Sequence, residues 1–330
     1  MKKTWIAGLA VLLSAAVLGG VAVLACSVIS SSDDKKTDNV LDRKSDGLYL
    51  NFQGKDYSDA GSIDIYLTVH DEATDKPVNG LTNDNFLFAE DGRDMGVEVQ
   101  AGVTQGNDLD ILLVLDLSKS MASGGAIEQL KLAATNFIDQ LSTKVRVGLV
   151  TFSDKYTVQR FFTEDLQEIR TLIQDLAPEG NFTNFYGSLS YGAGMFPDET
   201  LHVGRAIVAF TDGQDNVGQK TVKEVKDEID KNGIFLYAVG LGPEDNLDTK
   251  DIETLSTTGR FYRADQAGQL GDIFTDIADD LQSTYKLHYC TPKVKGEHVL
   301  RITTQQGTNS GWIEISFNTE KLSGGQCVTY

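Results

Sequence analysis

The chain has 330 residues, 41% of them hydrophobic, and a formal net charge of -19. This length and composition are typical of a globular protein with two or three domains. The acidity excludes nucleic acid and anionic membrane surfaces as electrostatic partners, because both repel a negative protein. The histidines and cysteines show no zinc-ligand spacing, which argues against a catalytic zinc.

Residues 1–25 have the pattern of a secretory signal. Lys2 and Lys3 precede an apolar run, and the run ends in Leu24-Ala25-Cys26, which resembles a bacterial lipobox. We therefore expect Cys26 to become the lipidated first residue of an exported, membrane-anchored lipoprotein. The apolar run of about 20 residues is also long enough to span a bilayer uncleaved. A third alternative is an ordinary cleaved signal. Ser27 after the cysteine favours the outer membrane if the host has two membranes.

Residues 26–46 are polar and charged, and we expect a solvated tether that does not pack. From 47 to 107 the apolar residues alternate with polar ones, as in Ile63-Asp64-Ile65-Tyr66-Leu67. Such alternation, broken by turn residues, predicts about four short antiparallel strands.

Residues 108–283 change to continuous apolar runs separated by helical patterns. The expected strands are 111–115, 145–152, 206–210 and 234–239. The expected helices are 126–141, 166–176, 187–195, 221–232, 251–257 and 270–281. This order predicts an α/β domain with a doubly wound, mostly parallel sheet that helices cover on both faces.

Alternation returns at 284–330, which predicts about three more strands. Because this segment is too small to bury a core alone, we expect both flanks to form one immunoglobulin-like β-sandwich with the α/β domain inserted into it. Two independent β pieces are the alternative. In an oxidising compartment the remaining cysteines, Cys290 and Cys327, are expected to form a disulfide, the alternative being two free thiols.

Oxygen-bearing side chains follow the predicted strands of the α/β domain. Asp116, Ser118 and Ser120 follow the first strand, and Asp212 follows the strand that begins at Ala206. Thr183 lies between them, in a loop before a helix. Ligands of open α/β sheets gather at the carboxyl ends of the strands. Three hydroxyls and two carboxylates suit Mg²⁺ or Mn²⁺, with a coordination position left for a carboxylate from outside.

These five residues, in this order, resemble the metal-ion-dependent adhesion site of a von Willebrand factor type A domain, over about 108–282. The resemblance implies binding to a protein partner that offers an acidic side chain, and it implies no reaction. The segments 76–92 and 285–289 resemble the β segments that flank this domain in some bacterial exported proteins.

Simpler roles remain open for these residues. The aspartates and serines are also common turn formers, and Thr183 is suited to cap a helix. Lys119, Asp215 and Asn216 are interpreted as surface residues beside the site. Residues 245–251 lack the order of a calcium loop and are interpreted as a solvated loop with a helix start.

Two other classes of function compete with adhesion. The first is a structural or assembly component of a cell-envelope complex, in which the metal only stabilises the fold. A Mg²⁺-dependent phosphoryl-transfer enzyme is the other class, but the sequence lacks a Walker motif, a D-x-D pair and a G-x-S-x-G elbow.

Overall fold

The computed structural model describes residues 40–57, 62–95, 102–105, 109–141, 144–197, 204–256, 260–291 and 295–322. The predicted signal, Cys26 and Cys327 lie outside these residues. None of the helices in the described ranges is long and apolar enough to cross a membrane.

The α/β region is built on a central sheet. In the described part of the chain its strand order is β12-β11-β10-β7-β8-β9. The strands are β7 (Leu109–Asp116), β8 (Val145–Phe152), β9 (Tyr156–Thr163), β10 (Gly204–Thr211), β11 (Ile234–Leu241) and β12 (Arg260–Ala264). All pairings are parallel except that of β9 with β8. The predicted doubly wound, mostly parallel sheet is thus confirmed.

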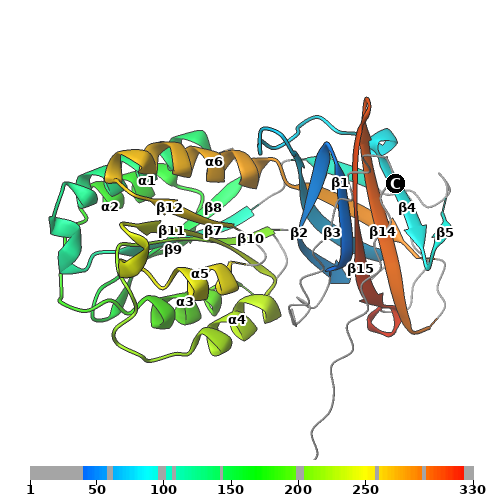
Figure 1. Ribbon diagram of the computed structural model, residues 1–330. Helices are drawn as coiled ribbons and strands as arrows, with labels where there is room; N and C mark the ends of the chain where they lie inside the picture. Colours follow the sequence, from blue (N-terminus) through cyan, green and yellow to red (C-terminus); the bar gives the residue numbers. More distant parts are fainter. Residues whose placement is uncertain are drawn as a thin grey trace, which may run out of the picture. The chain divides into compact units, whose positions relative to one another are not determined.

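Helices cover both faces of this sheet, with α1, α2 and α6 on one side and α3, α4 and α5 on the other (Figure 1). They are α1 (Ala126–Gln140), α2 (Leu166–Gln174), α3 (Phe185–Ala193), α4 (Val222–Lys231), α5 (Thr249–Leu255) and α6 (Leu270–Gln282). Alternate residues of β7 serve the two layers: Leu113 packs in one apolar core and Val114 in the other. This explains why the strand is apolar throughout.

The regions before and after the α/β region contribute strands to the same two sheets. One sheet has the order β1-β15-β14-β4-β5 and the other β2-β3-β13-β6. The early strands are β1 (Val40–Asp46), β2 (Leu48–Tyr57), β3 (Ser62–Asp71), β4 (Phe86–Glu90), β5 (Arg93–Asp94) and β6 (Gly102–Gln105). The late strands are β13 (Tyr285–Cys290), β14 (Glu297–Gln306) and β15 (Asn309–Asn318). Side chains of both sheets share one apolar core. An immunoglobulin-like topology and the domain limits stay predictions.

The predicted tether is too long. Its last residues form β1, which pairs antiparallel with β15, so this part of the prediction is wrong. The reason is that β1 lies at the edge of its sheet and has mostly exposed side chains. An edge strand is held by backbone hydrogen bonds and does not need the apolar alternation on which the prediction relied.

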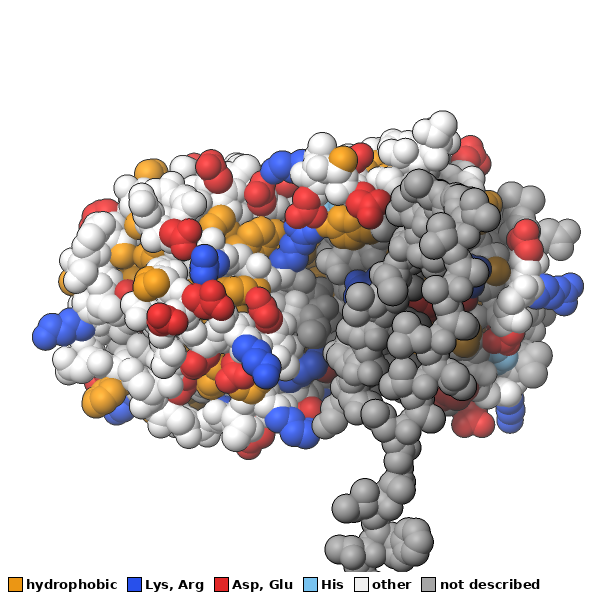
Figure 2. Space-filling model, in the orientation of Figure 1, with side chains coloured by type: hydrophobic (Ala, Val, Ile, Leu, Met, Phe, Trp, Pro, Cys, Tyr) orange, Lys and Arg blue, Asp and Glu red, His pale blue; other side chains and the backbone are white. Residues whose placement is uncertain are grey.

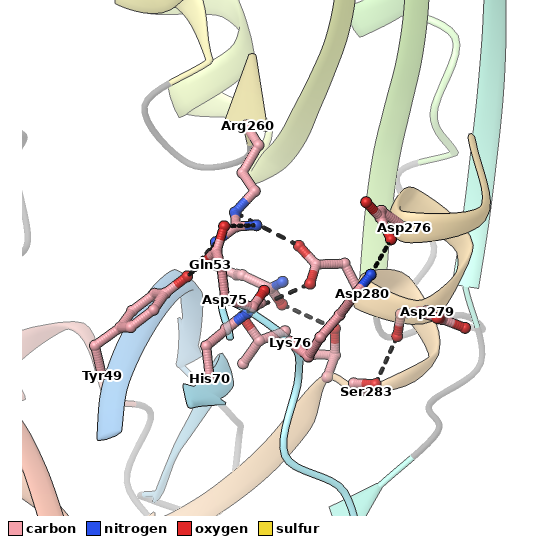
Figure 3. A network of polar contacts seen from close by, with 12 residues as sticks. Tyr49, Gln53, His70, Asp75, Lys76, Arg260, Asp276, Asp279, Asp280 and Ser283 are labelled. Atoms are coloured by element: carbon pink, nitrogen blue, oxygen red, sulfur yellow. Dashed lines mark hydrogen bonds and ion pairs between the residues drawn. The ribbon is translucent and has the colours of Figure 1, made fainter. Parts of the chain in front are cut away.

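A buried polar network joins strands β2 and β3 to strand β12 and helix α6 (Figure 3). Arg260 forms ion pairs with Asp75 at 2.7 Å and with Asp280 at 3.9 Å. His70 Nε2 lies 3.3 Å from Asp280 Oδ1, and both side chains are almost fully buried. Burial raises the pKa of Asp280 to about 7 and lowers that of His70 to about 4. At the open side of the network, Lys76 forms an ion pair with Asp276.

Candidate metal site

Two neighbouring strands carry the predicted carboxylates to one edge of the central sheet. Asp116 is the last residue of β7, and Asp212 follows Thr211, the last residue of β10. These strands pair in parallel, with Leu115 opposite Phe210. Asp116 is fully buried because it ends a strand whose residues are all buried. The sheet therefore fixes one carboxylate in the protein and places the second beside it.

Hydrogen bonds link the loop after β7 to both carboxylates. The backbone N–H of Ser118 donates to Asp116 Oδ1 at 2.8 Å. The hydroxyl oxygens of Ser118 and Ser120 lie 3.0 Å apart, and Ser120 Oγ donates to Asp212 Oδ1 at 2.8 Å. The D-x-S-x-S segment thus turns back on itself, and its hydroxyls lie between the two aspartates.

Thr183 enters from a different loop and is held there by its backbone. Its N–H donates to Asn216 Oδ1 at 2.8 Å, and the N–H of Asn216 donates back to the Thr183 carbonyl at 3.0 Å. The N-cap position of helix α3 is occupied by Asn184, whose side chain makes no capping hydrogen bond, so Thr183 is not the N-cap residue. Its hydroxyl oxygen lies 3.7 Å from where a Cβ on Gly213 would stand, which places it next to the Asp212 loop.

Thr211 belongs to the site and was missed by the sequence analysis. Its hydroxyl donates to Asp116 Oδ2 at 2.7 Å and lies 3.0 Å from the carbonyl oxygen of Gly213. A signal for it exists: Thr211 ends a strand directly before a predicted ligand, where its side chain faces the neighbouring strand end. Thr211 orients the buried carboxylate without facing the surface, being itself 1% exposed.

The two carboxylates repel one another in a partly dry environment. Burial, together with the charge of Asp212, raises the pKa of Asp116 to about 6. Burial also raises the pKa of Asp212. Within the described ranges, no lysine or arginine forms an ion pair with either aspartate. The site is therefore a pair of carboxylates without a protein counter-charge, which a divalent cation would stabilise.

The site opens into a hollow of about 420 Å³. Its lining comprises Ser118, Lys119, Ser120, Asn181, Thr183, Asp212, Gly213, Gln214, Asp215, Asn216, Asp245 and Asn246. Four of the five predicted ligands line the hollow, and buried Asp116 is joined to them by Ser118. On the face shown in Figure 2, acidic and basic side chains are otherwise mixed over the α/β region.

The neighbouring acidic residues have structural roles. Asp215 accepts hydrogen bonds from the backbone N–H groups of Tyr186, Val217 and Gly218, and so ties α3 to the Asp212 loop. Asp248 is the N-cap residue of α5, in agreement with the predicted helix start. The hydrogen bonds of Asp215 thus give it a role in the fold of this surface.

A second group with metal-ligand atoms lies in the β region and consists of Glu90, Asp91 and His298. His298 Nδ1 lies 2.7 Å from Asp91 Oδ2 and 3.3 Å from Glu90 Oε1. Tyr289 and Thr291 donate hydroxyl hydrogen bonds to Glu90. Because His298 already contacts both carboxylates directly, we assign no metal to this group.

Cys290 lies buried at the end of β13 and takes part in a disulfide. Its predicted partner, Cys327, lies outside the described residues, so the Cys290–Cys327 pairing stays a prediction.

The geometry is that of an α/β domain with an oxygen-ligand site at the carboxyl ends of its strands. Residues 110–276, half of the chain, match the family model of the von Willebrand factor type A domain, and the chain belongs to this family. Calcium-activated chloride channel regulator 1 from Bos taurus is 30% identical over 176 residues, covering 51% of this chain and 19% of that protein. Matrilin-2 from Mus musculus is 26% identical over 186 residues, covering 52% and 19%. The chain thus spans about a fifth of the length of these curated relatives.

Among solved structures, proximal thread matrix protein 1 from the mussel byssus, described as having a zinc-occupied MIDAS motif, shares the fold. It is 19% identical, with a TM-score of 0.50, and the match covers 56% of this chain and 49% of that one. This likeness supports the fold.

Proposed function

We propose that this protein binds a protein partner through a divalent cation held by Asp116, Ser118, Ser120, Thr183 and Asp212. The observation that carries the proposal is the pair of close carboxylates, surrounded by hydroxyls, that has no protein cation to balance it. A bound cation supplies the missing charge and attracts a carboxylate from outside the protein.

Mg²⁺ or Mn²⁺ is the cation that this donor set favours. The five side chains offer only oxygen atoms, and no sulfur or imidazole ligand lines the described part of the hollow. Hard divalent cations prefer oxygen ligands and retain water in their coordination shell. The mussel protein is described with zinc in its MIDAS motif. This is compatible with Mg²⁺ or Mn²⁺ here, because site geometry and metal availability decide which cation a site binds.

The buried and exposed members of the set have different tasks. Asp116 is buried at the base of the site and held by hydrogen bonds from Ser118 and Thr211, while Ser120 and Asp212 are accessible from the hollow. Thr211 and Asn216 hold the ligands in place through hydrogen bonds. With a cation held by these residues, a partner's carboxylate would reach it from the hollow.

We further propose that the protein is exported and anchored by lipid on Cys26, with the β region, residues 47–107 and 284–330, as an immunoglobulin-like carrier of the metal domain. The signal pattern before Cys26 supports export and the anchor. The pairing of β6, the last strand before the α/β region, with β13, the first strand after it, supports a β region that carries the metal domain. Retention of Cys26→Ala in the membrane after the same cleavage would contradict the anchor.

The test of partner binding is capture from an envelope extract in Mg²⁺ and in excess chelator. Wild-type protein should capture a partner only in Mg²⁺, and Asp116→Ala should capture none under either condition. Capture that is equal with and without chelator would contradict metal-mediated binding and favour a structural role. Phe161→Ala is a matched control, because it changes an exposed residue of β9 on the same domain.

A further inference from the structure

Phe182 is a large apolar side chain that remains 53% exposed beside the candidate metal site. Its two chain neighbours, Asn181 and Thr183, line the hollow. Since consecutive Cα atoms are about 3.8 Å apart, the backbone of Phe182 lies at the rim of the hollow, one residue from a proposed metal ligand. A partner segment held in the hollow is therefore within about a side chain's length of Phe182.

The loop that carries Phe182 is held along its whole length. Asp154 Oδ1 accepts the backbone N–H groups of both Asn181 and Phe182 at 2.6 Å. The N–H of Glu179 donates to the Leu117 carbonyl, and that of Asn184 donates to the Ser153 carbonyl.

Gly180 fixes the turn that precedes the ring. Its φ is +67°, and a Cβ there would stand 2.6 Å from the hydroxyl oxygen of Ser153. A side chain at this position is excluded both by the backbone conformation and by space. The ring of Phe182 is thus exposed on an anchored backbone, so little conformational entropy is lost when a partner covers it.

The charges around the hollow restrict what lies next to the partner's carboxylate. Asp212, Asp215 and Asp245 line the hollow against a single basic side chain in its lining, that of Lys119, so the acidic majority repels a second acidic side chain. A large apolar side chain meets no such repulsion at the Phe182 rim and removes the exposed ring from water.

We propose that Phe182 determines specificity: the partner presents a single acidic residue directly flanked by a large apolar residue, which packs on Phe182 while the carboxylate reaches the cation. This inference rests on the proposed metal-mediated function and adds the class of segment that the site selects. Phe182 contacts the partner only and holds no metal.

Synthetic peptides displayed on a surface provide the test. The probes are Gly-Leu-Asp-Leu-Gly, Gly-Gly-Asp-Gly-Gly and the Asn form of each, measured with the full mature chain in Mn²⁺ and in chelator. We expect wild-type protein to bind the Leu-flanked Asp peptide about tenfold more tightly than the Gly-flanked one, as burial of one aliphatic side chain predicts. In Phe182→Ala the two Asp peptides should bind about equally, whereas Phe161→Ala, which removes an equally exposed ring elsewhere, should keep the preference.

Mn²⁺ affinity, measured by calorimetry, distinguishes a failure of the role proposed for Phe182 from a failure of the proposed metal site. Phe182→Ala should bind Mn²⁺ as wild type does. A preference that survives in Phe182→Ala, or that is lost equally in Phe161→Ala, overturns the role of Phe182 while leaving the metal site intact. Loss of Mn²⁺ binding in Phe182→Ala also overturns it, since the ring would then support the metal. Absence of Mn²⁺-dependent binding to either Asp peptide overturns the proposed function together with this inference.

Discussion

Two clusters of carboxylates in this molecule differ in their counter-charges. In the network between β2, β3, β12 and α6, Arg260 and Lys76 lie among Asp75, Asp276 and Asp280 (Figure 3). At the candidate metal site, Asp116 and Asp212 have hydroxyl and N–H partners, and within the described residues no cationic side chain pairs with them.

The difference shows how to separate structural charge from functional charge. The carboxylates of the network have Arg260 and Lys76 as counter-charges inside the fold, although the cost of burial still outweighs them at Asp280, whose pKa is raised. A buried pair of carboxylates without a counter-charge keeps its electrostatic cost until a cation arrives. The first arrangement joins two parts of the chain, and the second is suited to bind something from outside.

The largest effect that we expect comes from removing the cation of the balanced network. Arg260→Met leaves Asp75 and the buried Asp280 without their arginine, which should lower the free energy of unfolding by about 3–5 kcal/mol. Urea denaturation at pH 7 measures it. A loss below about 1 kcal/mol would mean that the network is as weak as an exposed ion pair.

The buried carboxylate of the same network should make stability depend on pH. The pKa of Asp280 is raised by burial to about 7, so the folded state holds this proton more tightly than the unfolded state. The contribution of this proton to the free energy of unfolding is fully present below about pH 4 and is lost as the pH rises through 7. The free energy of unfolding of Asp280→Asn, relative to that of wild type, should therefore increase by about 2 kcal/mol from pH 5 to pH 8. Urea denaturation of both proteins at pH 5 and pH 8 measures this change. The same difference in free energy of unfolding at the two pH values would contradict the raised pKa.

His70 opposes this trend at lower pH. Burial lowers its pKa to about 4, so its contribution is present above about pH 6.5 and is lost as the pH falls toward 4. Between pH 7 and 8 His70 is neutral in both states, so this part of the Asp280 comparison is unaffected by it.

At the metal site we expect a smaller change in stability, visible only without metal. Asp116→Asn removes the buried negative charge and places an amide of nearly the same shape where the carboxylate stood. The repulsion with Asp212 therefore disappears. In chelator at pH 8 the variant should be more stable than wild type by about 1 kcal/mol. With saturating Mn²⁺ the order should reverse, because only wild type is stabilised by binding. Thermal denaturation under the two conditions measures this, and the same order in both would argue against a metal ligand.

The smallest effect should come from the exposed end of the network. Lys76 and Asp276 have side chains that are 60% and 41% exposed, and water screens their ion pair. Lys76→Ala should change the free energy of unfolding by less than about 0.5 kcal/mol. A loss comparable to that of Arg260→Met would show that burial is not what separates the two ion pairs.

The sequence predicts the central sheet and its site because both depend on local patterns. An apolar strand such as β7 is recognisable in itself, and the polar residue that ends it lies at the sheet edge in any parallel arrangement. The network of Arg260 and Asp75 could not be predicted, since these residues are 185 positions apart and their pairing depends on packing. Strand β9 was missed for a related reason: as an edge strand with mostly accessible side chains, it lacks a buried apolar run.

The central claim is that the uncompensated carboxylates, and not the compensated ones, hold a divalent cation. Calorimetric titration of Mn²⁺ into wild type, Asp116→Ala and Asp280→Asn tests it most directly. The account predicts one site of equal affinity in wild type and Asp280→Asn, and an affinity at least about 100-fold weaker in Asp116→Ala, which loses a ligand charge. Equal affinity of wild type and Asp116→Ala for Mn²⁺ would contradict the site.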